Sequence, residues 1–203
     1  MSEKQQEFWA GAGGDAYTAR NRVDWRRRRQ VWRDIMLDTG ARSVLEIGCN
    51  AGWNLTAIKE QAPWARAEGV DMNRTAVLMA TLAGCQATPG AMPEVFGPAL
   101  DVDDPPGLYE LVFTAGVLIH VDPEDLEETM RQIVVLSSRW VLAIEYEAEA
   151  EEEITYRGEQ GLLWKRPYGK LYEAMGLRHV RMPWPIGKDL GFDNCTAHLM
   201  EKP

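Results

Sequence analysis

The sequence predicts an α/β fold, a mostly parallel seven-stranded sheet with helices on both faces and one antiparallel edge strand. One reason is that short apolar runs alternate with helix-length segments, the pattern of parallel strands joined by crossover helices. A second reason is that the last two apolar runs have no clear helix between them, which favours a hairpin and one antiparallel strand. With 203 residues, the chain suits one domain with a sizeable core.

The order of the elements follows from hydrophobic periodicity and from glycine and proline. Residues 1–40 are expected to be helical, with an amphipathic helix from Thr18 to Asp38 that Gly40 ends. Pro123 begins a later helix, because proline fits the first helical position and acidic residues follow it. The other helices are expected at residues 54–61, 74–83 and 167–175. The strands are expected at residues 43–47, 65–71, 94–97, 109–114, 140–146, 177–182 and 195–201.

Composition restricts the partners of the protein. The net charge is −9, and a protein that binds duplex nucleic acid would usually carry a basic stripe. The dense basic run Arg26–Arg29 is either a solvated helix face or a contact for an anionic substrate. No stretch approaches the roughly 20 apolar residues of a membrane span. The three scattered cysteines indicate neither a zinc site nor a disulfide framework, so we expect no metal and a cytoplasmic location, while the oligomeric state stays open.

The most informative segment runs from Val44 to Asn54, where an apolar strand leads into a glycine turn and then a helix. Gly48 permits a tight turn, and Gly52 would let the backbone approach a ligand closely. The helix that follows offers free N–H groups to a polar ligand. Glu46 ends the strand, where its carboxylate can face an ammonium group or bound water.

Two nucleotide-binding patterns compete for this turn. A phosphate-binding P-loop requires a Gly-Lys-Ser or Gly-Lys-Thr ending, which is absent here. A dinucleotide site requires glycine at three places, and here they hold Gly48, Asn50 and Trp53. A ligand without a pyrophosphate therefore fits better, although an NAD-dependent oxidoreductase remains an alternative.

Two further segments supply polar groups to the same edge of the sheet. Asp71 ends the second predicted strand, where a carboxylate can accept both hydroxyls of a ribose, and Met72 can pack on an adenine. The fourth strand ends at Thr114 and leads into a loop that carries His120. This histidine is either a general base or a residue that only packs the loop.

Together, VLEIGCNAGWN, GVDMN and LVFTAGVLIHVDP resemble the class I S-adenosylmethionine (SAM)-dependent methyltransferases, over residues 40–145. The chain is most similar to the subgroup associated with pseudaminic acid biosynthesis. This finer similarity includes an N-terminal segment from Phe8 to Asn21 and a C-terminal one with Tyr156-Arg-Gly158 and Leu163–Arg166. The resemblance implies a Rossmann-like fold, SAM as cofactor and S-adenosylhomocysteine (SAH) as product.

The resemblance also implies roles for individual residues. Pro98 stands where many methyltransferases carry an acid that binds the adenine, so the backbone of Ala99, or Asp101, would have to replace it. The implied cofactor-binding residues are Glu46, Gly48, Asn50, Gly52, Asn54, Asp71, Met72, Ala99 and Thr114. The implied substrate-binding residues are Tyr17, Arg20, Asn21, Tyr156, Arg157 and Lys165, of which Arg157 and Lys165 either bind an anion or pair with the acidic run Glu147–Glu153. His120 is the first choice for a catalytic base, followed by Glu145 and Tyr146.

The expected organisation is one methyltransferase domain over residues 1–203. Residues 1–40 form an N-terminal helical lid, 41–146 the SAM-binding core, and 147–203 a substrate-side insertion with the C-terminal strands. We expect methyl transfer to N or O of a small, anionic metabolite such as a nucleotide-linked sugar or a phosphorylated compound. A methyltransferase that modifies nucleotides or nucleic acid, and a non-catalytic nucleoside-binding module, remain alternatives.

Overall fold

The structure is a computed structural model that describes residues 3–100, 108–156 and 158–203. Its main sheet has the strand order β3-β2-β1-β4-β5-β10-β8, with β9 also paired to β10. The first five strands in this order are parallel, whereas β10 runs antiparallel to β5 and to β8. The strands are β1 (Ser43–Ile47), β2 (Arg66–Asp71), β3 (Gln86–Pro89), β4 (Tyr109–Ala115), β5 (Ser137–Glu145), β8 (Arg178–His179), β9 (Trp184–Ile186) and β10 (Cys195–Glu201). A mostly parallel sheet with an antiparallel strand near its edge is confirmed. Among the described residues the sheet has eight strands and not the predicted seven, because two short strands, β8 and β9, pair with β10 where one strand was expected at residues 177–182.

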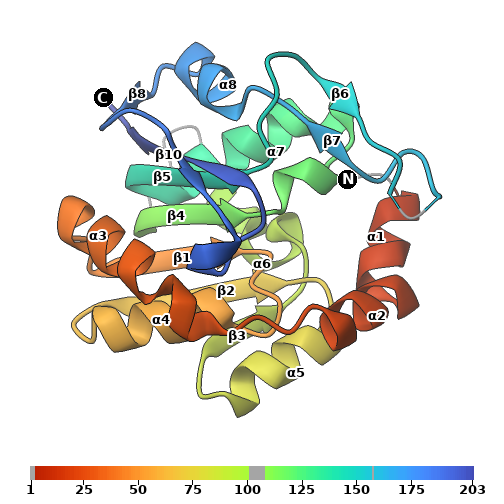
Figure 1. The fold of residues 1–203 in the computed structure, drawn as a ribbon, viewed down its shortest axis with the longest axis horizontal. Coiled ribbons are helices and arrows are strands. Elements are labelled where there is room, and N and C mark those ends of the chain that lie inside the picture. Colours follow the sequence, from red (N-terminus) through yellow and green to blue (C-terminus); the bar gives the residue numbers. More distant parts are fainter. Residues whose placement is uncertain (1–2, 101–107, 157) are drawn as a thin grey trace.

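Helices cover both faces of the sheet, as Figure 1 shows. The α-helices are α1 (Glu3–Ala10), α2 (Ala12–Arg20), α3 (Arg29–Thr39), α4 (Trp53–Gln61), α5 (Arg74–Leu82), α6 (Met92–Leu100), α7 (Pro123–Leu136) and α8 (Tyr168–Ala174). The short 3₁₀ helices are η1 (Trp25–Arg28), η2 (Leu118–His120) and η3 (Lys188–Leu190), and β6 (Glu152–Glu153) pairs with β7 (Trp164–Lys165) outside the main sheet. In the part of the chain that is described, no helix is long and apolar enough to cross a membrane.

The core has two halves because consecutive strand residues point to opposite faces. On β1, Val44 packs with α3 and α4, whereas Leu45 packs with α7 and α8. On β5, Leu142 and Val141 divide between the same two halves. Both faces of the central strands are therefore buried, which explains why they read as continuous apolar runs in the sequence.

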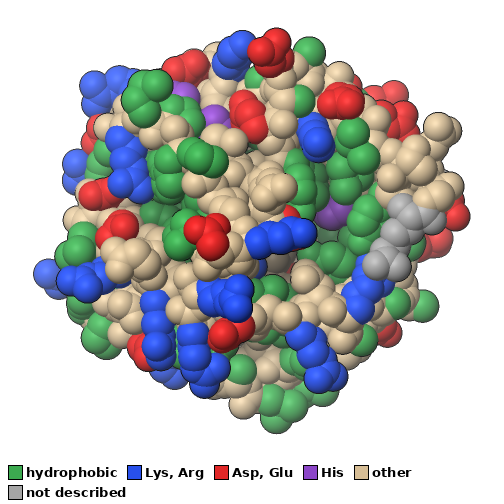
Figure 2. All heavy atoms as spheres, in the orientation of Figure 1, with side chains coloured by type: hydrophobic (Ala, Val, Ile, Leu, Met, Phe, Trp, Pro, Cys, Tyr) green, Lys and Arg blue, Asp and Glu red, His purple; other side chains and the backbone are tan. Residues whose placement is uncertain are grey.

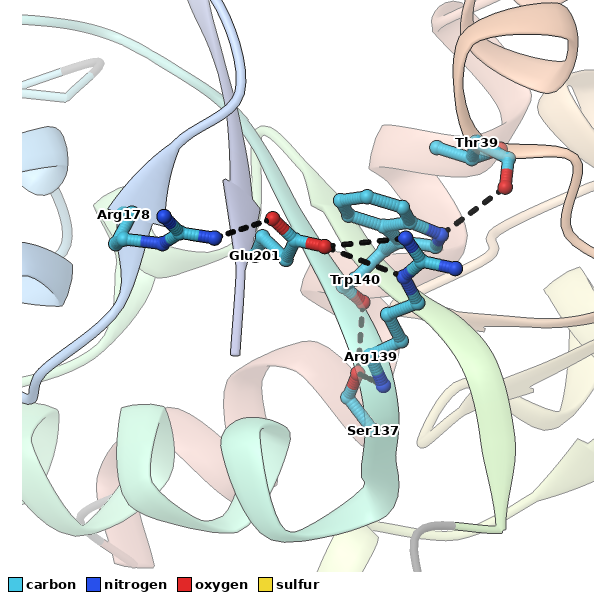
Figure 3. Close-up of polar contacts among 6 residues, drawn as sticks. All are labelled: Thr39, Ser137, Arg139, Trp140, Arg178 and Glu201. Carbon is cyan, nitrogen blue, oxygen red and sulfur yellow. Dashed lines mark hydrogen bonds and ion pairs between the residues drawn. The ribbon is translucent and has the colours of Figure 1, made fainter. Parts of the chain in front are cut away.

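Polar contacts stabilise the end of the sheet at which β5 begins and β10 ends (Figure 3). Glu201 on β10 accepts hydrogen bonds from Arg139 on β5, at 3.2 and 3.3 Å, and from Arg178 on β8, at 2.8 Å. The indole of Trp140 donates to the carbonyl of Thr39 at the end of α3, at 3.1 Å. These contacts tie three strands and one helix together at a distance from the functional residues described below.

Two predicted elements were wrong. The helix expected from Thr18 to Asp38 is broken into α2, η1 and α3, because Asp24 accepts a hydrogen bond from the backbone of Arg26 and so starts a new helical turn. The third strand, expected at residues 94–97, lies instead at Gln86–Pro89, and residues 94–97 belong to α6. The segment is apolar and short, so periodicity alone does not separate a strand from a buried helix.

Candidate functional site

A pocket of about 370 Å³ lies at the carboxyl ends of β1 and β4. The chain runs from β1 outward to β3 on one side and then crosses to β4 and β5 on the other, so the strand order reverses between β1 and β4. Ligands of open α/β sheets bind at such a reversal, and the volume suits a small molecule. Figure 2 shows the hollow in the middle of the face it displays, with basic side chains beside it.

The glycine bend after β1 forms the floor of the pocket. Gly48 has φ +72°, and a Cβ there would lie 2.5 Å from Cγ2 of Val117, so only glycine fits. The N–H groups of Gly48 and Cys49 both donate to the carbonyl of Val70, which fastens the bend to β2. Gly52, with φ +75°, plays another part than predicted: it is not among the lining residues, and its Cα faces Cys85 and Ala80.

An acidic and a basic side chain lie beside this bend and are linked through Asn54. Glu46 is buried and lines the pocket; its Oε1 accepts a 2.6 Å hydrogen bond from Asn54, while its Oε2 has no hydrogen-bond partner among the described residues. Asn54 in turn accepts from Nη1 of Arg28 at 2.8 Å and from the indole of Trp32 at 3.1 Å. Burial raises the pKa of Glu46 to about 8, although Asn54 and Arg28 act in the opposite direction.

The sequence alone did not distinguish Arg28 from the other arginines of its basic run. The run 26–29 was expected to be solvated or to meet an anionic substrate, yet Arg28 is buried, lines the pocket and stacks on Phe192 at 4.2 Å. Its Nε donates to the carbonyl of Gly191. Glu46 and Arg28, linked through Asn54, can together hold the ammonium and carboxylate of an amino acid.

Asp71 lies at the end of β2 and also lines the pocket, as predicted from its position. Its two carboxylate oxygens accept the backbone N–H groups of Asn50 and Asn73, both at 2.8 Å. Burial raises the pKa of this carboxyl. Since a carboxylate has about four lone-pair positions, two remain for a ligand's hydroxyl groups.

The structure brings Met72 to the pocket but leaves the role of Ala99 as a prediction. Met72 follows Asp71 and lines the pocket with the segment 90–93 that follows β3. Ala99 lies in α6, where no side chain after Gly97 is described, and Asp101 lies outside the described residues. Thr114 is buried, and the three residues after it line the pocket in its place.

His120 is held in one tautomer at the other end of the pocket. Its Nδ1 lies 2.7 Å from the carbonyl of Leu162, which can only accept, so Nδ1 carries the hydrogen and Nε2 keeps a lone pair. Burial lowers the pKa of His120 to about 4, which keeps the ring neutral at pH 7. The geometry makes Nε2 an acceptor for an O–H or N–H group.

Aromatic rings of the N-terminal helices lie against His120. The ring centroid of Trp9 is 4.3 Å from that of His120, and Tyr17 packs edge-on against Trp9 at 5.5 Å. Both Trp9 and Tyr17 line the pocket. No functional role was predicted for Trp9 within the N-terminal segment from Phe8 to Asn21, because its contact with His120 joins positions too far apart for local periodicity to detect.

Glu145 and Tyr146, the alternative bases, do not line the pocket. Glu145 is fully buried, and its Oε1 accepts from the backbone of Val117 and Leu118 at 3.1 and 3.2 Å. Burial raises the pKa of Glu145 to about 7. The hydroxyl of Tyr146 donates to Asp193 at 2.8 Å. Glu145 therefore fastens the loop that leads to His120 rather than facing a ligand.

The predicted substrate-binding residues are only partly brought together. Tyr17 and Asn21 line the pocket, and Arg20 donates to the hydroxyl of Tyr156 at 2.8 Å. Tyr156 also lies 5.8 Å from His120 between ring centroids. Lys165 does not line the pocket; it lies on β7 opposite Glu152. Arg157 lies outside the described residues.

Arg166, the neighbour of Lys165, holds the loop that carries His120. Its side chain is 1% exposed and donates to the carbonyls of Leu118 and Val121, at 3.0 and 2.9 Å, and to Glu151 at 2.7 Å. The sequence motif Leu163–Arg166 was given a substrate-binding role only at Lys165. Its buried arginine instead fixes the chain on both sides of His120.

Comparisons with known proteins identify the family. A family model described as a methyltransferase domain matches residues 24–181. The chain belongs to this family. The methyltransferase is similar in fold to 1,6-didemethyltoxoflavin-N1-methyltransferase from Burkholderia thailandensis, solved with 1,6-didemethyltoxoflavin and SAH (TM-score 0.69, 15% identity, 98% of this chain and 87% of that chain covered).

Two further solved structures have the same fold. Magnesium protoporphyrin IX methyltransferase from Synechocystis PCC 6803, with bound SAH, has a TM-score of 0.69 at 13% identity, covering 98% of each chain. A sugar N-methyltransferase from Streptoalloteichus sp ATCC 53650 has a TM-score of 0.62 at 15% identity, covering 95% of this chain and 93% of that one. Among curated proteins none matches. The prediction of a class I SAM-dependent methyltransferase is confirmed at the level of family and fold, while the pseudaminic acid subgroup stays a prediction.

Proposed function

We propose that this methyltransferase transfers the methyl group of SAM to a nitrogen or oxygen of a small-molecule acceptor. The observation that carries the proposal is the arrangement around the glycine bend: Glu46 and Arg28 lie on one side, and Asp71 lies at the end of the next strand. SAM is an amino-acid-bearing nucleoside, and this arrangement offers groups for each of its polar parts. We call residues 28, 46–54 and 71–73 the donor half of the pocket.

Each group of the donor half suits one part of SAM. Oε2 of Glu46, which has no partner, accepts from the ammonium, and Arg28 pairs with the carboxylate. Asp71 has two unused lone-pair positions for the ribose hydroxyls, and Met72 packs on the adenine. Without a lysine in the bend or a glycine at position 53, the same segment fits a pyrophosphate poorly. This favours SAM over NAD.

The acceptor half comprises Trp9, Tyr17, Asn21 and His120, with Arg20 and Tyr156 beside it. Bound SAM supplies an activated methyl on a sulfonium, so the protein's main task is to hold the acceptor in line with it. Nε2 of His120 accepts a hydrogen bond from the acceptor's O–H or N–H and so orients its lone pair. With a pKa of about 4, His120 orients the acceptor more than it removes a proton.

We further propose that the acceptor is a small anionic metabolite, such as a nucleotide-linked sugar or a phosphorylated compound. Among the described residues, Arg20 supports this, because it lies beside Tyr17 and Tyr156 at the acceptor half. Arg28, in contrast, is engaged at the donor half. The division into a lid at 1–40, a SAM-binding core at 41–146 and a substrate-side insertion at 147–203 belongs to the same proposal.

Calorimetry with SAH and with NAD tests the donor assignment. We expect SAH to bind and NAD not to bind; binding of NAD alone would overturn the proposal in favour of an oxidoreductase.

Incubation with methyl-labelled SAM and a panel of amines, phenols, carboxylates, nucleotide sugars and oligonucleotides tests the acceptor class. With the acceptor that is found, His120→Ala should lower turnover on the order of tenfold and leave SAH affinity unchanged. Unchanged turnover would rule out a role for His120, and SAH binding without transfer to any acceptor would favour a non-catalytic module.

A further inference from the structure

Two asparagines fasten the N-terminal helices to the donor half. The side-chain amide of Asn73 donates to the carbonyl of Trp9 at 3.2 Å and to Asp15 at 3.0 Å. The side-chain amide of Asn50 donates to the hydroxyl of Thr18 at 3.1 Å. Asn73 and Thr18 are almost fully buried. The last turn of α1 and two points along α2 are therefore held by one residue of the glycine bend and one residue that follows β2.

The same two asparagines are also held by Asp71. One carboxylate oxygen accepts the backbone N–H of Asn50 and the other accepts that of Asn73. Asn50 has φ +45°, a left-handed conformation that is uncommon outside glycine and that its neighbours must maintain. The carboxylate assigned to the ribose thus fixes the backbone from which both side chains reach the helices.

Trp9 connects this network to the acceptor half. Its carbonyl accepts from Asn73, while its indole lies 4.3 Å from the ring of His120. Gly14 makes the hydrogen bond between Asn73 and Trp9 possible, because a Cβ at this position would collide with the carbonyl of Trp9 and with the side-chain amide of Asn73. A shift of Asn73 would therefore move the indole of Trp9, which belongs to the acceptor half.

We propose that Asn50 and Asn73 are positioning residues that couple donor binding to the placement of the N-terminal helices over the acceptor half. The inference rests on the proposed function. Ribose hydroxyls on Asp71 immobilise the two backbone N–H groups, and the two side chains transmit this order to α1 and α2. Because coupling is reciprocal, the placed helices strengthen donor binding by the same factor.

Asn73→Asp separates this role from a structural one. Oδ1 of Asn73 also caps α5 by accepting from the backbone of Ala76 at 2.8 Å, and aspartate caps helices equally well. The substitution keeps the cap and the side-chain shape but replaces the donor NH₂ by an acceptor that faces the carbonyl of Trp9 and the carboxylate of Asp15. Thr18→Val, which keeps the shape and removes the hydroxyl, does the same for the Asn50 contact.

Hydrogen–deuterium exchange of the peptides covering residues 3–20, with and without saturating SAH, tests the proposal. In the wild type we expect SAH to slow exchange in these peptides at least several-fold, with peptides from α8 as the unaffected reference. In Asn73→Asp this protection should disappear at saturating SAH, and SAH should bind about tenfold more weakly. Thr18→Val should lose part of the protection. Unchanged unfolding temperatures would show that both variants remain folded.

The double variant Asn73→Asp with Asp15→Asn supplies the matched rescue. It re-creates the side-chain hydrogen bond with donor and acceptor exchanged, so part of the SAH-dependent protection should return. Two results would overturn the coupling while the proposed function stands. One is that SAH binds the wild type but leaves exchange at residues 3–20 unchanged, and the other is that Asn73→Asp retains full protection. If SAH does not bind the wild type at all, the proposed function itself fails.

Discussion

The donor half and the acceptor half of the pocket are assembled in different ways. The donor half comes mainly from one stretch of chain, residues 46–73, in which strand, bend, helix and strand follow one another. The acceptor half comes from helices near the N-terminus, the loop after β4 and the segment after β5, and it includes the contact between Arg20 and Tyr156, 136 positions apart. Local sequence spacing therefore determines the first half, whereas long-range packing determines the second.

Destabilising the acceptor half alone is the most direct test of this difference between the two halves. Arg166→Met removes the side-chain donor to two buried carbonyls: Leu118 keeps only the backbone N–H of Val121, and Val121 loses its arginine donor. We therefore expect about 3 kcal/mol of lost unfolding free energy. Denaturant unfolding measures the loss, and Lys165→Met, at the neighbouring position, is the control with little expected effect. SAH affinity should change little, because the hydrogen bonds of Arg166 reach neither the donor half nor the α1–α2 helices that Asn50 and Asn73 hold. An equal loss of SAH affinity would show that the two halves are not separable.

The sequence predicts the donor half well because its chemistry is local. Glu46, Gly48, Asn54 and Asp71 each follow from a strand end or a bend, and the structure brings all four to the pocket region. Gly52 was assigned to the ligand because local sequence does not reveal which neighbour fills the space at its Cα; here α5 fills it. A glycine pattern thus locates the bend and does not assign each glycine a role.

The acceptor half was predicted in part because its residues act through distant partners. Tyr17 and His120 were found from their motifs, whereas the placement of Trp9 against His120 depends on how α1 packs. Glu145 had the strand-end position of a base, but its carboxylate is used by backbone N–H groups of a loop. Arg28 lay hidden in a basic run because only the tertiary structure shows which of four arginines is buried.

The donor half can be broken at Asp71. Asp71→Ala removes the acceptor of both ribose hydroxyls, and hydrogen bonds to a charged group contribute about 1.5–3 kcal/mol each, so we expect SAH to bind at least about 100-fold more weakly. Calorimetry gives the dissociation constant, and the unfolding temperature reports the loss of the bonds to Asn50 and Asn73. His120→Ala, from the acceptor half, is the control with unchanged affinity. A dissociation constant that Asp71→Ala leaves unaltered would remove the basis of the donor assignment.

A proton-counting experiment sharpens the assignment of Glu46. Burial raises its pKa from 4.5 to about 8, so the free folded protein holds a proton that the unfolded chain releases; the folded state therefore loses stability as the pH rises from about 4.5 through 8. An ammonium beside Oε2 requires the ionised form, so SAH binding at pH 7 should release close to one proton, and affinity should rise with pH up to about 8. Calorimetry in two buffers of different ionisation enthalpy measures the release.

Methylthioadenosine, which lacks the amino acid, provides the matched ligand for that experiment. It should bind without releasing a proton, and Glu46→Gln should abolish the release with SAH while weakening its binding roughly tenfold. Equal proton release with the two ligands would assign the titrating group elsewhere, such as to Asp71, whose pKa is also raised by burial.

The smallest effect is expected at the far edge of the sheet, where Glu201 bridges Arg139 and Arg178 (Figure 3). The two arginines are 59% and 70% exposed at their side chains, so water screens both pairs, and Glu201→Gln should cost less than about 1 kcal/mol of unfolding free energy. SAH affinity and the exchange of residues 3–20 should not change. Because Glu201 lies on the strand that pairs with β5, a larger effect on SAH binding would mean that the sheet itself transmits strain to the pocket. The two halves would then be coupled through the sheet as well as through Asn50 and Asn73, and the effects of Arg166→Met and Asp71→Ala would have to be interpreted through the sheet they share.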